Sequence, residues 1–137
     1  LELAKSLNMP TIVHCRNSDE KLLESLIETK STKGVVHCFA SNVNFANKLF
    51  DIGYHISFTG LITFAKDLIE VVRKVPLGKF MLETDSPYLT PVPYRGKRNE
   101  PSMVKIIAEK ISEIKNLDIN IIENETTKTA QKLFEFK

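Results

Sequence analysis

Short apolar runs alternate along the chain with longer segments in which apolar residues recur at helical spacing. Four runs predict β-strands, at residues 11–14, 35–37, 54–58 and 80–82. Apolar stripes with three- and four-residue spacing predict α-helices over residues 22–27, 45–50, 64–75, 104–114 and 122–134. Strands that alternate with helices in this way predict right-handed βαβ units on a parallel sheet.

Local signals mark the ends of several predicted helices. Asn17 has capping-box spacing with a glutamate ahead of the first stripe, and Pro76 ends the third. The first seven residues resemble the last turns of an amphipathic helix that begins earlier, and the chain starts at Leu1 rather than Met. We therefore expect further sequence upstream.

Polar side chains stand where three of the predicted strands end. His14 and His37 end the first two runs, and Asp85 follows the fourth. In parallel α/β folds, both barrels and open sheets, the carboxyl ends of the strands meet at one edge, where active sites lie. His55 stands at the beginning of its run, on the opposite edge, so we interpret it as structural.

Two imidazoles and a carboxylate on rigid strand ends are typical ligands of a divalent ion. Each residue also has a structural explanation. A single histidine near a strand end is usually just hydrogen bonded, and Asp85 before Ser-Pro is also explained as a turn residue. Two histidines at equivalent positions of consecutive units favour the metal site.

Composition is that of one ordinary globular domain over residues 1–137, with 42% hydrophobic and 26% charged residues. The net charge is only +2, so attraction to phosphate depends on a local cluster, for which Arg95, Lys97 and Arg98 are the candidates. A solvated loop explains Lys97 and Arg98 equally well. With no apolar run near the roughly 18 residues of a membrane span and no signal-peptide pattern, we expect a cytoplasmic protein without membrane association.

Two cysteines, Cys15 and Cys38, directly follow the two histidines. They form no CxxC pair and are too few for a disulfide framework, so we expect free thiols in a reducing compartment. On extended strands they point away from the histidine side chains, which favours core packing over thiolate ligation.

Several longer segments resemble one known family. LETDSPYLTP, followed by PYRGKRNEP, closely resembles the C-terminal signature of the TatD family of metal-dependent deoxyribonucleases. PTIVHCR at residues 10–16 resembles its P-x-x-x-H-x-R element, GVVHCF at 34–39 its G-V-x-H-C-F element, and YHISFTG at 54–60 its following strand. The four elements occur in family order and cover essentially the whole chain.

The resemblance implies a TIM (β/α)8 barrel of the metal-dependent hydrolase type, of which this chain would be only the C-terminal half, strands five to eight. It implies two divalent metal ions, Mg or Zn, and hydrolysis of phosphodiester bonds in DNA. By the same resemblance His14 and His37 bind one metal. Asp85 binds the other and is the catalytic residue that orients the attacking water.

Substrate contacts are implied in the same way. Arg16 is expected to meet substrate phosphate, and Arg95 and Asn99 lie on a loop beside the same mouth. Such groups contact the DNA backbone without reading bases, so little sequence specificity is expected. The family's H-x-H pair and bridging glutamate have no counterpart in this sequence, so we expect the isolated chain to be inactive.

Two other functions stay open. A non-catalytic half barrel would have two unpaired strand edges, which are templates for pairing with another copy or with a separate N-terminal fragment. An amidohydrolase acting on another ester or C–N bond would use the same scaffold. The basic loop favours phosphate without excluding either alternative, and the sequence leaves the oligomeric state open.

Overall fold

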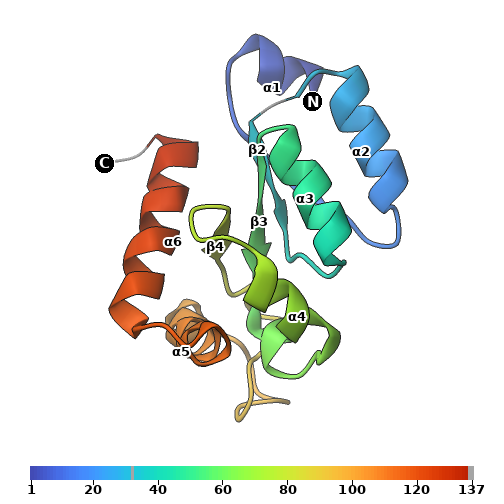
Figure 1. Ribbon diagram of the computed structural model, residues 1–137. Helices are drawn as coiled ribbons and strands as arrows, with labels where there is room; N and C mark the ends of the chain where they lie inside the picture. The colour runs from blue at the N-terminus through green and yellow to red at the C-terminus, as the bar shows by residue number, and fades with distance from the viewer. Residues whose placement is uncertain (32, 136–137) are drawn as a thin grey trace.

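Four parallel strands form one sheet in the computed structural model, which describes residues 1–31 and 33–135 (Figure 1). They are β1 (Thr11–His14), β2 (Gly34–His37), β3 (Tyr54–Phe58) and β4 (Phe80–Leu82), in the order β1-β2-β3-β4. Each neighbouring pair is parallel. The predicted strands and their parallel arrangement are confirmed, with Gly34 added at the beginning of β2.

Helices connect the strands and follow the last one. They are α1 (Glu2–Ser6), α2 (Asp19–Glu28), α3 (Val43–Asp51), α4 (Asp67–Lys74), α5 (Val104–Lys115) and α6 (Ile119–Phe134), with short 3-10 helices η1 (Gly60–Thr63) and η2 (Pro101–Met103). In the described part of the chain, no helix has both the length and the apolar character to cross a membrane.

Two local predictions about helix ends were wrong. Asn17 does not cap α2. Ser18 occupies the cap position, and Asn17 has a φ of 53° in the preceding turn, a left-handed conformation that asparagine tolerates well. The third predicted helix is present as α4, but it begins at Asp67 rather than at Phe64, which directly follows η1.

The two faces of the sheet pack against different helices, because successive strand residues point to opposite sides. One face carries the main core, where strand residues pack against α2 to α5: Val36, Tyr54, Ile56, Phe58 and Phe80. On the other face Val35 and Met81 pack against Leu133 of α6, which stands along the sheet in Figure 1. His37 lies two residues beyond Val35 and therefore belongs to the α6 face, at the end of its strand.

A buried tyrosine ties the amino-terminal edge of the sheet together. The Tyr54 hydroxyl lies 2.7 Å from Thr11 Oγ1 and 2.6 Å from Ser31 Oγ. Tyr54 reaches Thr11 across β2 because position 34 has no side chain: a Cβ on Gly34 would lie 2.5 Å from Thr11 Oγ1 and 2.6 Å from Tyr54 Cε1. These hydroxyls link β1, β3 and the turn before β2.

Replacing Tyr54 by Phe is expected to lower the free energy of unfolding by about 1–3 kcal/mol, because it leaves the buried Ser31 hydroxyl without this partner. Tyr88→Phe is the matched control. Tyr88 is 71% exposed, and its substitution is expected to change stability by less than about 0.5 kcal/mol. Urea unfolding followed by circular dichroism measures both, and equal stabilities would show that the hydroxyl cluster does not hold this edge.

Candidate metal centre

The two histidines predicted at the strand ends lie side by side. His14 ends β1 and His37 ends β2, and the parallel pairing sets them directly opposite each other. His14 Nδ1 is 3.0 Å from His37 Nε2, so the rings share a hydrogen bond, and their centroids are 5.0 Å apart. His14 is exposed to solvent, whereas His37 is half-buried. The predicted convergence of the two imidazoles is confirmed.

A carboxylate just past β4 lies on the other side of His37. Glu83 Oε1 accepts hydrogen bonds from the backbone N–H of Cys38 and from Ser57 Oγ, each at 2.6 Å, and it is 3.6 Å from His37 Nδ1. The Ser57 hydroxyl also accepts from Cys38 N at 3.3 Å. One carboxylate therefore connects the ends of β2, β3 and β4.

Ser57 is the residue of this cluster that reasoning from the sequence missed. It is 2% exposed and lies between Ile56 and Phe58, which are both fully buried. A buried serine in such a run is the signal that could have revealed it, because a buried hydroxyl requires a hydrogen-bonding partner.

Asp85 lies beyond the end of β4, in a turn. The strand ends at Leu82, Asp85 has a φ of 54°, and its carbonyl accepts a hydrogen bond from Tyr88 N at 2.9 Å. The backbone therefore leaves the extended path of β4 before it reaches Asp85. The negative charge of Asp85 adds to the effect of burial in raising the pKa of the Cys38 thiol, just past β2.

The histidine pair fits a divalent ion by its chemistry and its spacing. Two nitrogens that each lie about 2.0–2.1 Å from one ion are about 3.0–3.4 Å apart. Among residues 1–31 and 33–135, however, no three His, Cys, Asp or Glu side chains form a group that could hold an ion. The structure thus brings His14 and His37 together without assembling them with Asp85, and the full ligand set stays a prediction.

Both cysteines directly follow the histidines in the chain and are free thiols. Burial raises the pKa of Cys15, which packs against the main core as predicted. Burial is also the main cause that raises the pKa of Cys38, whose Sγ lies 3.7 Å from Thr59 Oγ1. His55 lies near the beginning of β3, as predicted, and burial lowers its pKa.

The loop after β4 is fastened by two of the residues predicted to contact substrate. Arg95 Nη1 donates to Thr90 O at 2.9 Å, and its guanidinium lies 4.0 Å from the centre of the Phe64 ring. Asn99 is 2% exposed, and its amide group donates to Thr84 O and to Tyr88 O. These contacts give both residues a structural role, and their contact with substrate stays a prediction.

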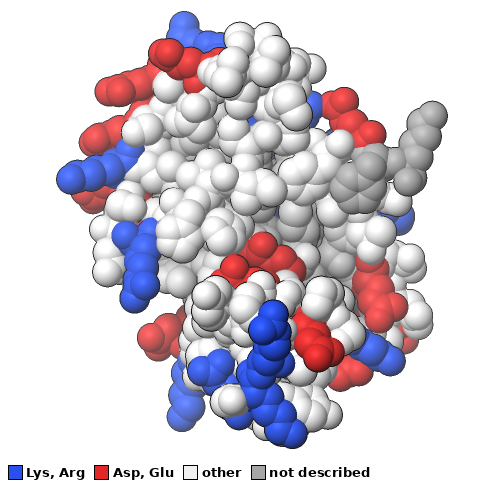
Figure 2. All heavy atoms as spheres, turned by 180° about the vertical axis from the view of Figure 1, so that it is seen from behind, with Lys and Arg blue, Asp and Glu red and all other residues white. Residues whose placement is uncertain are grey.

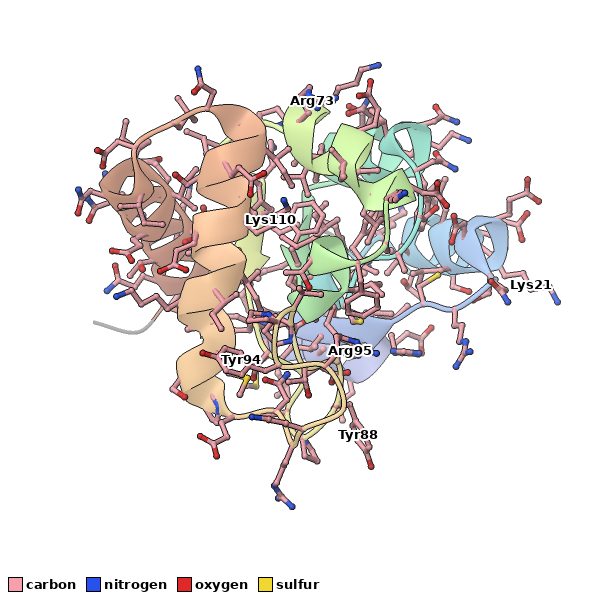
Figure 3. All side chains as sticks on the ribbon, turned by 90° about the horizontal axis from the view of Figure 1, so that it is seen from below. Lys21, Arg73, Tyr88, Tyr94, Arg95 and Lys110 are labelled. Atoms are coloured by element: carbon pink, nitrogen blue, oxygen red, sulfur yellow. The ribbon has the colours of Figure 1, made fainter. Side chains whose placement is uncertain are left out.

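Charged side chains gather at this end of the molecule. Figure 2 shows Lys and Arg side chains at the lower end, where the loop after β4 lies, with acidic side chains above them. In Figure 3 Tyr88 points away from the body of the protein, whereas Arg95 lies over it. Lys97 Nζ lies 5.7 Å from the centre of the Tyr94 ring. Arg95, Lys97 and Arg98 of the predicted basic cluster are all exposed, and Arg95 also lies against the Phe64 ring.

Arg16 is exposed beyond β1 and lines a cavity of about 570 Å³. The cavity lies between the turns that follow β1 and β2. Asp19 joins these turns, since its carboxylate accepts hydrogen bonds from Ser41 Oγ and from Cys15 Sγ. Within the described part of the chain, Arg16 makes no ion pair. Its charge is therefore available to an anion.

Asn99→Asp is expected to lower the free energy of unfolding by about 1–3 kcal/mol, because the carboxylate has no N–H to offer the carbonyls of Thr84 and Tyr88. Asn124→Asp on the exposed side of α6 is the matched control and is expected to stay within about 0.5 kcal/mol. Chemical denaturation of both variants tests this. An unchanged midpoint for Asn99→Asp would show that the amide does not fasten the loop.

Comparison with known proteins agrees with this geometry. The sequence profile of a family described as "TatD related DNase" matches residues 1–135. The chain is 43% identical to an uncharacterized metal-dependent hydrolase of Buchnera aphidicola (from Acyrthosiphon pisum), covering 98% of this chain and 52% of that protein. It is 41% identical to the uncharacterized metal-dependent hydrolase YabD of Bacillus subtilis, covering 98% of this chain and 54% of the relative. The chain thus spans about half the length of the curated relatives it matches.

Solved structures show the same relationship. The TatD homologue YjjV of Escherichia coli superposes with a TM-score of 0.93 at 27% identity, covering 99% of this chain and 54% of that one. A TatD family hydrolase of Entamoeba histolytica gives 0.85 at 26% identity, over 96% of this chain and 53% of that one. The fold is therefore of the TatD-like, TIM-barrel type, here with four parallel strands. By sequence and by structure, the chain belongs to the TatD family of metal-dependent hydrolases.

Proposed function

We propose that this chain contributes to the active site of a metal-dependent deoxyribonuclease that hydrolyses phosphodiester bonds. The observation that carries the proposal is the His14–His37 pair, whose facing nitrogens are 3.0 Å apart at the carboxyl edge of the sheet. The family description names a DNase, and the curated relatives are named metal-dependent hydrolases. A basic loop and Arg16 at the same edge favour a phosphate-bearing substrate.

In this proposal His14 and His37 hold one divalent ion, and Asp85 holds a second. Imidazole ligands suit Zn better than Mg, and carboxylate suits either. When bound, such ions supply Lewis acidity and a water of lowered pKa. The Asp85 carboxylate would supply the oxygen that orients the attacking water and takes up a proton. Arg16 neutralises phosphate oxygens, which binds DNA through its backbone rather than its bases.

The complete activity is proposed for a protein of about the relatives' length, since this chain covers about half of them. Its four strands would form the C-terminal half of the barrel, strands five to eight. The further ligands expected in the family have no counterpart in this sequence, so the chain by itself is proposed to be inactive. Groups beyond the described residues would then supply the remaining ligands of the ion.

A second candidate, a non-catalytic module that binds a partner, is favoured by one observation. Among the residues that the structure describes, β1 pairs with a neighbour on one side only, and apolar side chains on and before it are exposed, including Leu3 at 73% and Ile12 at 64%. Exposed apolar patches often mark interaction surfaces. Metal-dependent cleavage that survives in the purified chain would exclude this candidate.

Asp85→Asn, made in the longest form that the gene encodes, is expected to lower kcat for DNA cleavage by about 10²–10⁴-fold, because the amide cannot accept a proton. Binding of DNA is expected to persist. Asp51→Asn at the exposed end of α3 is the matched control and should keep full activity. Release of a fluorescent end from labelled DNA, with and without chelator, measures this, and parental turnover in Asp85→Asn would refute the assigned role.

Arg16→Ala is expected to weaken DNA binding and to reduce the slope of log K against log salt by about one, as for the loss of one phosphate contact. Arg73→Ala is the control, because Arg73 pairs with Glu70 at 2.9 Å and lies far from Arg95 in Figure 3. Fluorescence anisotropy at several salt concentrations gives both slopes. Identical slopes for Arg16→Ala and the parent would remove Arg16 from the substrate contacts.

A further inference from the structure

A buried hydroxyl and a backbone N–H hold the Glu83 carboxylate in one place. Ser57 Oγ and Cys38 N both lie 2.6 Å from the same oxygen, Oε1. Hydrogen bonds from two donors fix the position of a carboxylate. Ser57 is itself rigid, because it is 2% exposed in the middle of β3. The position of Oε1 is therefore set by β2 and β3, although Glu83 follows β4.

The same oxygen faces one particular nitrogen of His37. Oε1 is 3.6 Å from Nδ1, whereas Nε2 faces His14. A neutral imidazole carries its proton on only one nitrogen, and the neighbour of one nitrogen decides which. A carboxylate near Nδ1 favours the proton there, which leaves the lone pair on Nε2.

We propose that Ser57 and Glu83 are positioning residues that keep the His37 proton on Nδ1 and so present Nε2 as the metal-binding atom. The ring is half-buried and has a polar neighbour at each nitrogen, so the two contacts together also fix its orientation. With this tautomer and no metal, His37 Nε2 is the acceptor of the hydrogen bond that the two rings share, and His14 Nδ1 is the donor. The inference rests on the proposed function only in its last step, that Nε2 binds metal.

The serine is required because the carboxylate is otherwise loosely held. Glu83 is part of no strand, and its side chain would be free to rotate away from His37 without the two donors. A carboxylate often accepts a hydrogen bond from the second ring nitrogen of a metal-binding histidine. Removing such a carboxylate commonly weakens metal binding by about 10–100-fold. Ser57 acts through Glu83, and Glu83 acts through His37, so neither is proposed to touch substrate.

The first test is long-range 1H–15N NMR of the histidine rings in the metal-free chain. In the parent protein His37 is expected to carry its proton on Nδ1. In Glu83→Gln and in Ser57→Ala the proton is expected to be shared with Nε2. Ser41→Ala is the matched control, because Ser41 also donates to a carboxylate, that of Asp19, away from His37. His55, near the opposite end of the sheet, is an internal reference whose pattern should not change.

Titration of zinc into the same samples separates the inference from the proposed function. In the parent protein the His14 and His37 signals are expected to shift together, and Kd is expected to rise about 10–100-fold in Glu83→Gln. If zinc moves neither histidine, the metal assignment is wrong, while the tautomer result stands by itself. If His37 carries its proton on Nε2 in the parent, or on Nδ1 alone in both variants, the positioning role is wrong. Glu83→Gln keeps the size of the side chain, and the parent spectrum alone can overturn the proposal should Ser57→Ala fail to fold.

Discussion

The hydrogen bonds received by Glu83 are the interaction on which the candidate site depends. Parallel pairing brings strand ends to one edge, but it does not orient the side chains there. One carboxylate oxygen that binds a serine of β3 and a backbone N–H just past β2 fixes the relative positions of three strand ends. His37 lies beside that oxygen, and His14 is oriented in turn by His37. The buried groups therefore position Glu83, Glu83 lies beside His37, and His37 orients His14 on the exposed edge strand.

At the opposite edge of the sheet, hydrogen bonds between hydroxyl groups hold the same strands together. There Tyr54 crosses β2 over Gly34 to reach Thr11, and every group involved is a neutral hydroxyl or ring. At the carboxyl edge, the hydrogen bonds between strand ends instead involve the Glu83 carboxylate and the His14 and His37 imidazoles. Such a division lets the polar groups at the carboxyl edge depart from optimal packing, because the strands are already aligned at their beginnings. A change at Tyr54 should therefore disturb the site only by disturbing the sheet.

Much of the fold and half of the candidate site could be predicted from the sequence, because both follow from periodicity. Four apolar runs separated by helical stripes gave the parallel sheet, and two histidines at equivalent strand ends gave the observed pair. What could not be predicted depends on tertiary contacts between distant residues. Asn99 and Arg95 resemble substrate-binding groups in a polar loop, yet the loop folds back so that Arg95 covers Phe64 and Asn99 is buried. Asp85 looked like a strand-end ligand, and a left-handed turn placed it outside the strand's alternation.

The asymmetry between the two histidines indicates where an ion would gain its remaining ligands. His37 is half-buried, and the Glu83 carboxylate lies 3.6 Å from its Nδ1, so that side of the ring is already occupied. His14 is exposed and ends an edge strand whose other side has no partner among the described residues. An ion held between the two imidazoles would therefore have its free coordination positions on the β1 side, where they face solvent or groups from another part of the protein. Since no third ligand stands ready among residues 1–31 and 33–135, binding by this pair alone should be weak, and tight binding would require groups that approach from beyond β1.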